Sequence, residues 1–388
     1  MSPAPAIPEL APESYDEAAE MLRDTPSGAG VRFRGGGTKL GWGQPVRDVD
    51  RELSTTRLDT VLEHNEGDFT VIVQAGVRLA DLQAALRSKG QRLALDPPIG
   101  EGSEATIGGI AACADAGPLR HRYGSPRELI LGSAVALSNG AVARSGGKVI
   151  KNVAGYDLGK LYAGSFGTLG LILELALRLH PLPPRTVTVL GRSADPDRIA
   201  AAARALADAP LEPEALDVRW IGGEGAVLVM LAGDAAEALA TRARSLLDDA
   251  GLEAETADDG DAPWATQRAG QRSAEGAVAK VSATATRLPD VLRAAERHGA
   301  AVVGRAAHGV SWMKLGPRSD AELVESVASL RRELAPSPCA VLDAPEAIRE
   351  RIDAFGLEAA PERALMSSVK NRLDPLDGCN PGLFGEAL

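Results

Sequence analysis

Cysteine is scarce in this chain, whose 388 residues include only Cys113, Cys339 and Cys379. These residues form no C-x-x-C pair, so they can build neither an iron–sulfur cluster nor a structural zinc site, and we expect reduced, buried thiols. Histidine is also sparse, and no two histidines have the spacing of a metal-binding pair: His64, His121, His180, His298 and His308. The sequence therefore predicts no metal site.

Long apolar runs, a basic N-terminus and an excess of positive charge are missing as well. A membrane-spanning helix takes about 20 consecutive apolar residues, and no such run occurs. The first residues, MSPAPAIPEL, lack the basic start and the apolar stretch of a signal peptide, so we expect a cytoplasmic protein. The net charge of -11 argues against nucleic acid as a partner, because phosphate backbones are bound by clustered Lys and Arg.

The abundant residues indicate an α+β protein of two domains. The chain is 45% hydrophobic and 24% charged, and it is longer than one compact core can usually hold. Leucine occupies every odd position from Leu169 to Leu179, a period of two that predicts a strand. Proline at 181, 183 and 184 then marks a boundary. We predict a first domain at 1–183, a second at 184–345 and a C-terminal segment, 346–388, that returns to the first.

The second domain repeats one order of elements, strand–helix–strand–strand–helix. Two such units predict an antiparallel sheet with helices on one face. The acidic stretch from Glu253 to Asp261 lies between the units, and we expect a solvated loop there. The expected strands are 186–190, 215–220, 226–231, 278–283, 301–305 and 310–314, and the expected helices are 199–209, 235–249, 289–297 and 321–334.

Glycine-rich loops in the first domain are candidate phosphate sites. Arg34-Gly35-Gly36-Gly37-Thr38 follows a strand-like segment, and backbone without side chains could present successive N–H groups to a phosphate oxygen. Ala105-Thr106-Ile107-Gly108-Gly109 opens an Ala-rich stretch and could meet a second phosphate at a helix start. A third loop, 164–170, runs into the leucine-rich strand. The first loop alone fits a plain turn equally well, and the third fits a bulge or a tight turn. The first two loops together would suit a diphosphate.

These segments resemble the flavin domain of the vanillyl-alcohol-oxidase type, also called the p-cresol-methylhydroxylase type, and within it the FAD-binding subunits of bacterial glycolate oxidases. The motifs that carry the resemblance are the 105–109 loop, Ala116-Gly117-Pro118, the 151–158 stretch KNVAGYDL, the 164–170 loop and the tail motifs at 369–375 and 380–382. The resemblance implies a two-lobed FAD-binding domain followed by a cap domain. It also implies work in a complex that oxidises a small 2-hydroxy acid, with a second FAD subunit and an iron–sulfur subunit as partners.

By this resemblance, the two glycine loops hold the pyrophosphate of FAD, Pro97 and Pro98 lie along the dinucleotide, and Gly170 with Ile172 packs near the adenine. We expect noncovalent FAD, because the first loop offers Thr38 and Lys39 where covalently flavinylated members use residues such as His. The full expected set is Arg34, Gly35, Gly36, Gly37, Thr38, Lys39, Leu40, Pro97, Pro98, Ala105, Thr106, Ile107, Gly108, Gly109, Ala112, Cys113, Gly117, Pro118, Tyr123, Gly124, Asn152, Gly167, Gly170, Ile172 and Asn380.

Catalytic residues are harder to assign. The candidates are Lys151, Tyr156 and His308. The basic group Arg120, His121 and Arg122 could bind a carboxylate or could form a solvated rim. Two other functions stay open: a free-standing FAD-dependent D-2-hydroxy-acid dehydrogenase, and a scaffold subunit in which FAD only stabilises the fold.

Overall fold

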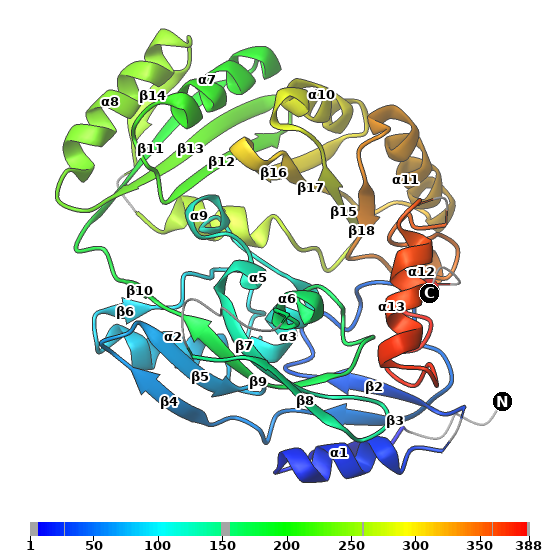
Figure 1. Ribbon diagram of the computed structural model, residues 1–388. Helices are drawn as coiled ribbons and strands as arrows, with labels where there is room; N and C mark the ends of the chain where they lie inside the picture. The colour runs from blue at the N-terminus through cyan, green and yellow to red at the C-terminus, as the bar shows by residue number, and fades with distance from the viewer. Residues whose placement is uncertain (1–6, 27, 149–155, 258–259, 359, 386–388) are drawn as a thin grey trace.

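The first half of the chain folds around two sheets. The computed structural model describes residues 7–26, 28–148, 156–257, 260–358 and 360–385, and both sheets lie in the lower part of Figure 1. A parallel sheet has the order β1 (Glu9–Leu10), β3 (Val49–Ser54), β2 (Gly30–Arg34). An antiparallel sheet has the order β4 (Val61–Asn65), β5 (Thr70–Gln74), β9 (Leu171–Arg178), β7 (Ile130–Ala136), β8 (Val142–Gly146).

Strand β9 is the expected leucine-rich strand, with one irregularity. Its register with β7 shifts so that Glu174 pairs with Ala134 and Ile172 with Val135, which leaves Leu173 as a bulge. A bulge reverses the alternation of side chains beyond it. The odd-numbered leucines consequently serve two clusters: Leu171 and Leu173 pack with the parallel sheet, and Leu175 and Leu177 pack with the short helices.

Short helices cover the antiparallel sheet and the loops around it. Their bounds are α1 (Tyr15–Arg23), α2 (Leu79–Arg87), α3 (Ile107–Cys113), α4 (Arg120–Tyr123), α5 (Pro126–Leu129) and α6 (Gly159–Tyr162). A two-stranded ribbon of β6 (Gln91–Arg92) and β10 (His180–Pro181) leads to the second sheet system. Within the described ranges, no helix is long and apolar enough to cross a membrane.

The second half of the chain forms an 8-stranded antiparallel sheet, in the upper part of Figure 1. The expected order of strands and helices is confirmed, and each expected element begins and ends within three residues of its expected bounds. The order is β14 (Glu253–Thr256), β11 (Thr186–Ser193), β13 (Glu224–Ala232), β12 (Ala215–Ile221), β16 (Ala300–Arg305), β17 (Val310–Leu315), β15 (Ala277–Ser282), β18 (Cys339–Val341). The helices are α7 (Pro196–Asp208), α8 (Ala236–Asp249), α10 (Leu288–Arg297) and α11 (Asp320–Leu334).

The expectation of a solvated loop at Glu253–Asp261 was wrong for its first part. Residues Glu253–Thr256 are β14, which pairs with β11 at the edge of the sheet. An edge strand tolerates charged side chains because one of its sides faces water. Helices α7, α8, α10 and α11 share one face, as predicted, whereas α9 (Ala262–Ala269) covers part of the opposite face with Trp264.

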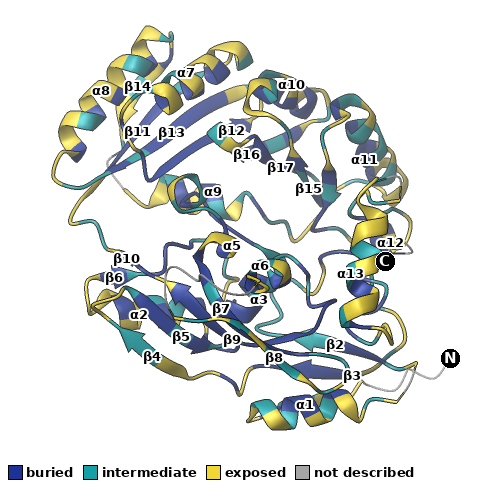
Figure 2. Ribbon diagram, viewed as in Figure 1, coloured by how far each residue is buried: buried dark blue, intermediate teal, exposed yellow. Residues whose placement is uncertain are grey.

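Buried hydrogen bonds join the inner face of the large sheet to the first half of the chain, and the strands of this sheet are mostly coloured as buried in Figure 2. Arg305 is fully buried and donates from Nε to Gly117 O at 2.9 Å and from Nη1 to Asp217 at 2.6 Å. Gln271 donates to Ala116 O at 3.1 Å. Five large aromatic residues are buried: Trp42, Tyr162, Trp220, Trp264 and Trp312.

The C-terminal part of the chain crosses back to the parallel sheet. It contains α12 (Glu346–Arg349) and α13 (Arg363–Leu373), and Cys379 then bridges Val31. Lys370, buried in α13, donates to Thr168 O at 3.0 Å and to Asp374 at 2.6 Å. This ammonium group holds the tail against the loop that precedes β9.

Candidate functional site

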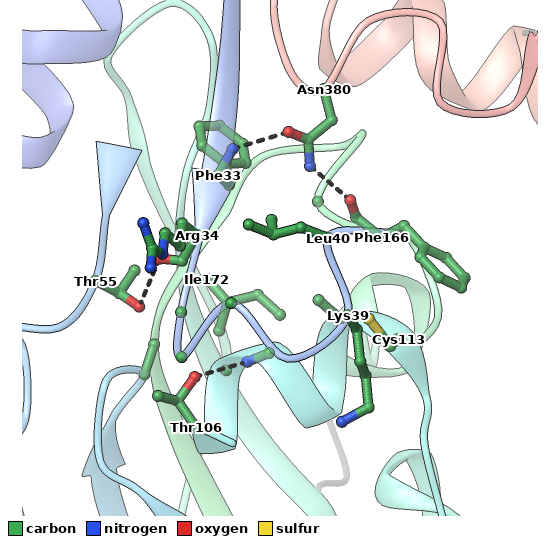
Figure 3. A pocket seen from close by; sticks show the side chains of 18 of the residues that line it. Phe33, Arg34, Lys39, Leu40, Thr55, Thr106, Cys113, Phe166, Ile172 and Asn380 are labelled. Carbon is green, nitrogen blue, oxygen red and sulfur yellow. Dashed lines mark hydrogen bonds between the residues drawn. The ribbon is translucent and has the colours of Figure 1, made fainter. Parts of the chain in front are cut away.

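A cavity lies between the two sheets of the first half. It contains about 870 Å³ of space free of protein atoms, part of which is open to solvent. Its walls come from the end of β2, the loop after it, helix α3, the start of β9 and the tail (Figure 3). Arg34, Lys39, Thr106, Ile172 and Asn380 surround it in the close-up view.

The loop after β2 offers unused hydrogen-bond donors. Among the described residues, none accepts a hydrogen bond from the successive backbone amides of Gly35, Gly36, Gly37, Thr38 and Lys39. All of these residues line the cavity. A run of amides without acceptors is a characteristic anion-binding feature of protein backbone. This loop is therefore chemically suited to a phosphate group.

Two of its glycines are required by contact between loops. A Cβ at Gly36 would lie 1.7 Å from the carbonyl oxygen of Glu104, and a Cβ at Gly35 would lie 2.2 Å from Oγ1 of Thr106. The two glycine-rich loops thus pack back to back. Gly35 and Gly36 have no side chains on the face of the first loop that contacts the second loop, so the loops can approach closely. The amides of the first loop still have no acceptor among the described residues.

The second loop provides a wall with few free donors. Thr106 caps helix α3, and its Oγ1 accepts from the amide of Gly109 at 3.3 Å. The amide of Ile107 donates to Val77 O at 2.9 Å, and that of Gly108 donates to Ala75 O at 2.8 Å. The expectation that this loop's amides meet a phosphate was wrong for Ile107, Gly108 and Gly109, because all three amides already have partners.

Charged residues flank the free amides. Arg32 and Arg34 share the buried carboxylate of Glu52, at 2.6 Å and 3.1 Å, and Arg34 also lies 3.8 Å from exposed Glu9. Ion pairs in water are weak, so Glu9 neutralises Arg34 only slightly. Two guanidinium groups beside one buried carboxylate leave positive potential at this edge of the cavity.

A second ion pair closes the other end of the loop. Lys39 Nζ lies 3.2 Å from Asp115 Oδ2 and 3.3 Å from the carbonyl oxygen of Pro98, and both charged side chains are almost fully buried. Nearby, Trp42 donates from Nε1 to Asp343 at 2.8 Å. Cys113 also lines the cavity, and burial raises the pKa of its thiol to about 12.

The tail completes the wall through one amide side chain. Asn380 Oδ1 accepts from the backbone amide of Phe33 at 2.8 Å, and its Nδ2 donates to Phe166 O at 2.7 Å (Figure 3). Phe166 in turn packs edge-on against Phe355 and Phe384. This end of the cavity is aromatic, and the loop end is polar.

Most of the expected cofactor-binding residues meet at this cavity. Those that line it are Arg34, Gly35, Gly36, Gly37, Thr38, Lys39, Leu40, Ala105, Thr106, Gly108, Gly109, Ala112, Cys113, Gly167, Gly170, Ile172 and Asn380. Sequence reasoning missed further lining residues, among them Phe33, Trp42, Thr55, Ile110, Phe166 and Leu383. The position of Leu383 just after the Asn380-Pro381-Gly382 motif was the available signal for that residue.

The remaining expected residues lie elsewhere. Ile107 belongs to the core beneath α3, and Pro97 is buried away from the lining. Gly117, which precedes Pro118, accepts a hydrogen bond from Arg305 through its carbonyl oxygen. Tyr123, which precedes Gly124, donates a hydrogen bond to Glu214 at 2.9 Å. These contacts join the two halves of the chain. Asn152 lies outside the described residues.

Neither of the two expected catalytic residues that the structure describes, Tyr156 and His308, lines the cavity. Tyr156 is 88% exposed, and His308 is exposed on the large sheet, with its ring bonded to His121 O at 3.2 Å. Lys151 lies outside the described residues. In the part of the chain that the structure describes, no group of three or more His, Cys, Asp or Glu side chains could hold a metal ion.

Comparison with known proteins agrees with this geometry. Residues 9–146 match the family model described as an FAD binding domain. The glycolate oxidase subunit GlcE of Escherichia coli strain K12 is 33% identical over 205 residues, which are 50% of this chain and 57% of that protein. The glycolate oxidase subunit GlcD of Bacillus subtilis strain 168 is 35% identical over 200 residues, 51% of this chain and 42% of that protein.

Two further comparisons concern the fold and the share of each relative that this chain covers. A solved structure of alkyldihydroxyacetonephosphate synthase has a TM-score of 0.70 at 15% identity, over 96% of this chain and 75% of that chain, so it shows a shared fold. A D-lactate dehydrogenase of Anaerostipes hadrus is 34% identical over 166 residues, 43% of this chain and 33% of that protein. The chain spans about half the length, or less, of the curated relatives that it matches.

Proposed function

We propose that the chain, whose residues 9–146 match the model of an FAD binding domain, is the FAD-binding redox subunit of an enzyme that oxidises a small 2-hydroxy acid. The observation that carries the proposal is the run of unpaired amides from Gly35 to Lys39 on the wall of a cavity. The pyrophosphate of FAD is an anion that such amides can bind.

The rest of the cavity fits the other parts of FAD. Arg32 and Arg34 place positive potential beside the amides, and Leu40, Ile110, Leu171 and Ile172 supply apolar surface for planar rings. Gly37, Thr38 and Lys39 continue the run of unpaired amides along the wall of the cavity. Bound FAD would supply an acceptor for the hydride that leaves the hydroxyl-bearing carbon of the acid.

Noncovalent binding is part of the proposal. Among the described residues that line the cavity, Cys113 is the one whose side chain could attach to a flavin carbon, but a thiolate and not a thiol is the nucleophile. With a pKa of about 12, the Cys113 thiol keeps its proton near neutral pH. Denaturing the purified protein with acid should therefore release the flavin into the supernatant. Flavin that stays with wild-type protein, and is released from Cys113→Ser, would show a covalent link instead.

We place the chain in a complex with a second FAD subunit and an iron–sulfur subunit. Two observations support a partner-dependent role. The sequence resembles glycolate oxidase subunits, and the relatives GlcE and GlcD carry the name of a subunit. In addition, none of the three cysteines pairs with another, so this chain supplies no cluster ligands of its own.

An absorbance spectrum of the purified chain tests the proposal, recorded before and after anaerobic addition of glycolate and of D-lactate. We expect flavin bands that persist until partner subunits are added. Bands that bleach with the isolated chain would support a free-standing dehydrogenase. A chain that contains no flavin, and that takes up none when refolded with FAD, would contradict the proposal.

A further inference from the structure

We infer that Arg272 and Asp343, which belong to the second half of the chain, position the peptide between Thr38 and Lys39 for the pyrophosphate of FAD. Neither Arg272 nor Asp343 is among the residues that line the FAD cavity, whereas Thr38 and Lys39 are. Binding of FAD and contact between the two halves of the chain are thereby coupled. The inference extends the proposed function and rests on it.

Arg272 reaches the loop after β2 through one carbonyl oxygen. It follows helix α9, and its Nη2 donates a hydrogen bond to Thr38 O at 2.9 Å. Thr38 O and the amide of Lys39 belong to one peptide unit, which is planar and trans, so they point in opposite directions. A donor that fixes the oxygen therefore also fixes the N–H group. That N–H group ends the run of amides, starting at Gly35, that have no acceptor among the described residues.

Asp343 holds the guanidinium group of Arg272 in one orientation. Its carboxylate accepts hydrogen bonds from Arg272 Nε at 2.8 Å and from Nη2 at 3.1 Å, and from the amide of Ser273 at 3.0 Å. Asp343 is itself fixed to the large sheet, because its carbonyl oxygen accepts from the amide of Val278 in β15 at 2.7 Å. A bidentate pair restricts direction as well as distance. Arg272 therefore reaches Thr38 from a defined direction.

The same carboxylate also contacts the cavity wall, through Trp42. Asp343 accepts from Trp42 Nε1 at 2.8 Å, and the centroid of the Trp42 ring lies 5.2 Å from Cζ of Arg272. The buried ion pair with Asp115 holds the side chain of Lys39. The two halves of the chain thus hold this end of the loop together. A loop that is ordered in advance leaves a smaller entropy cost to the binding step.

A purely structural role would make Arg272 one bond among several at the junction. Arg305 donates to Gly117 O at 2.9 Å. Arg349 in α12 donates from Nη1 to Gly43 O at 3.0 Å. These bonds keep the two halves together without Arg272. Loss of Arg272 should therefore act on the end of the loop and leave the junction closed.

Binding of FAD to the flavin-free full chain tests the inference. We would titrate wild type, Arg272→Met, Arg272→Lys and Asp343→Asn with FAD and follow flavin fluorescence. Arg287→Met is the matched control, since the Arg287 side chain is 28% exposed and that of Arg272 is 27% exposed. Arg287 likewise bonds a carbonyl oxygen, Leu334 O at 2.9 Å, and a carboxylate, Asp290 at 3.3 Å. Neither partner lines the cavity.

We expect Arg272→Met to bind FAD about tenfold more weakly than wild type, as for the loss of one hydrogen bond to a charged group. Arg272→Lys should recover part of this loss, because its ammonium group can still donate to Thr38 O. Asp343→Asn should weaken binding by a smaller factor, since asparagine still accepts one hydrogen bond from the guanidinium group. Arg287→Met should bind FAD as wild type does, even where its unfolding midpoint falls as far as that of Arg272→Met.

Wild-type affinity in Arg272→Met, or an equal loss of affinity in Arg287→Met, would overturn the inference. Should Arg272→Met fail to fold, wild-type affinity in both Arg272→Lys and Asp343→Asn would overturn it.

Hydrogen exchange at the loop is a second measurement, which a general loss of stability would not mimic. With FAD at saturation, the amides from Gly35 to Lys39 should exchange slowly in wild type, because each has gained an acceptor. In Arg272→Met at the same occupancy, the Lys39 amide should exchange faster while the Gly36 amide stays slow. Equal protection of both amides in the variant would contradict the inference.

The wild-type titration separates this inference from the proposed function. A wild-type chain that binds no FAD would contradict the proposed function, and the inference with it. A wild-type chain that binds FAD, beside an Arg272→Met variant that binds it equally well, would contradict the inference alone.

Discussion

Both loops at the cavity are rich in glycine, but they differ in the hydrogen bonding of their backbone amides. In the loop after β2, the amides from Gly35 to Lys39 have no acceptor among the described residues, whereas the amides of Ile107, Gly108 and Gly109 are all bonded within the protein. In both loops, glycines also allow protein segments to touch: Gly36 meets Glu104, and Gly108 meets Ala75. A glycine motif can thus indicate close approach to a ligand, to the chain itself, or to both.

The largest effect is expected for Gly36→Ala. The new Cβ would lie 1.7 Å from a backbone oxygen, so the two loops must move apart. Such overpacking costs about 3 kcal/mol or more of unfolding free energy, which urea unfolding would measure. Gly41→Ala is the matched control, because a Cβ there meets nothing within 4 Å. Equal stability of the two variants would contradict the back-to-back packing of the loops.

Gly108→Ala should destabilise the protein by a smaller amount. Its Cβ would lie 2.6 Å from the Cβ of Ala75 and 2.9 Å from the Ala75 oxygen, so we expect a loss of about 2 kcal/mol. Removing the facing methyl group in a Gly108→Ala, Ala75→Gly double variant should recover part of this loss. A double variant whose stability is the sum of both single effects would show that the two residues do not interact.

Gly109→Ala should separate binding from folding. A Cβ there meets only Thr106 Oγ1, at 3.2 Å, and alanine favours a helix by up to about 1 kcal/mol over glycine. We expect unchanged or higher stability, with roughly tenfold weaker FAD binding, or about 1.4 kcal/mol, because the methyl group faces the cavity. Fluorescence titration with FAD measures the affinity, and Gly316→Ala, a remote glycine with free space around it, is the control. Unchanged affinity would show that this wall does not contact FAD.

The smallest effect is expected for Thr106→Val. The change removes the N-cap of α3 and leaves the Gly109 amide without its acceptor, which should cost about 1 kcal/mol. Thr106→Ser should restore most of the stability in thermal unfolding, since it keeps the oxygen. A valine variant as stable as wild type would mean that the cap contributes nothing.

The parts of the fold that follow a local pattern could be predicted from sequence. Strand 310–314 and helix 321–334 were expected within one or two residues, because alternation and helical periodicity are properties of the segment alone. Strand β14 was missed, because its glutamates read as a loop until its place at the sheet edge is known. The bulge at Leu173 depends on pairing with β7, so the leucine pattern could not reveal it.

The site could be predicted only in part, for a similar reason. Glycine-rich segments were identified as cavity walls. The hydrogen-bond acceptors of the Gly108 and Ile107 amides, however, are the carbonyl oxygens of Ala75 and Val77, which precede helix α2 in the chain. The buried indole N–H of Trp312 has no acceptor among the described residues, and no sequence motif marks this residue. Unsatisfied groups become visible only when all neighbours are in place.

The bond between Asn380 and the amide of Phe33 joins residues that are 347 positions apart. During synthesis, the ribosome releases the Gly35–Lys39 loop and the strand at Ile172 long before it reaches Asn380. The wall of the cavity is therefore still open while the second half of the chain is being made. We expect cofactor loading to follow translation, and a cell short of FAD to accumulate full-length chains whose tail is undocked and sensitive to proteases.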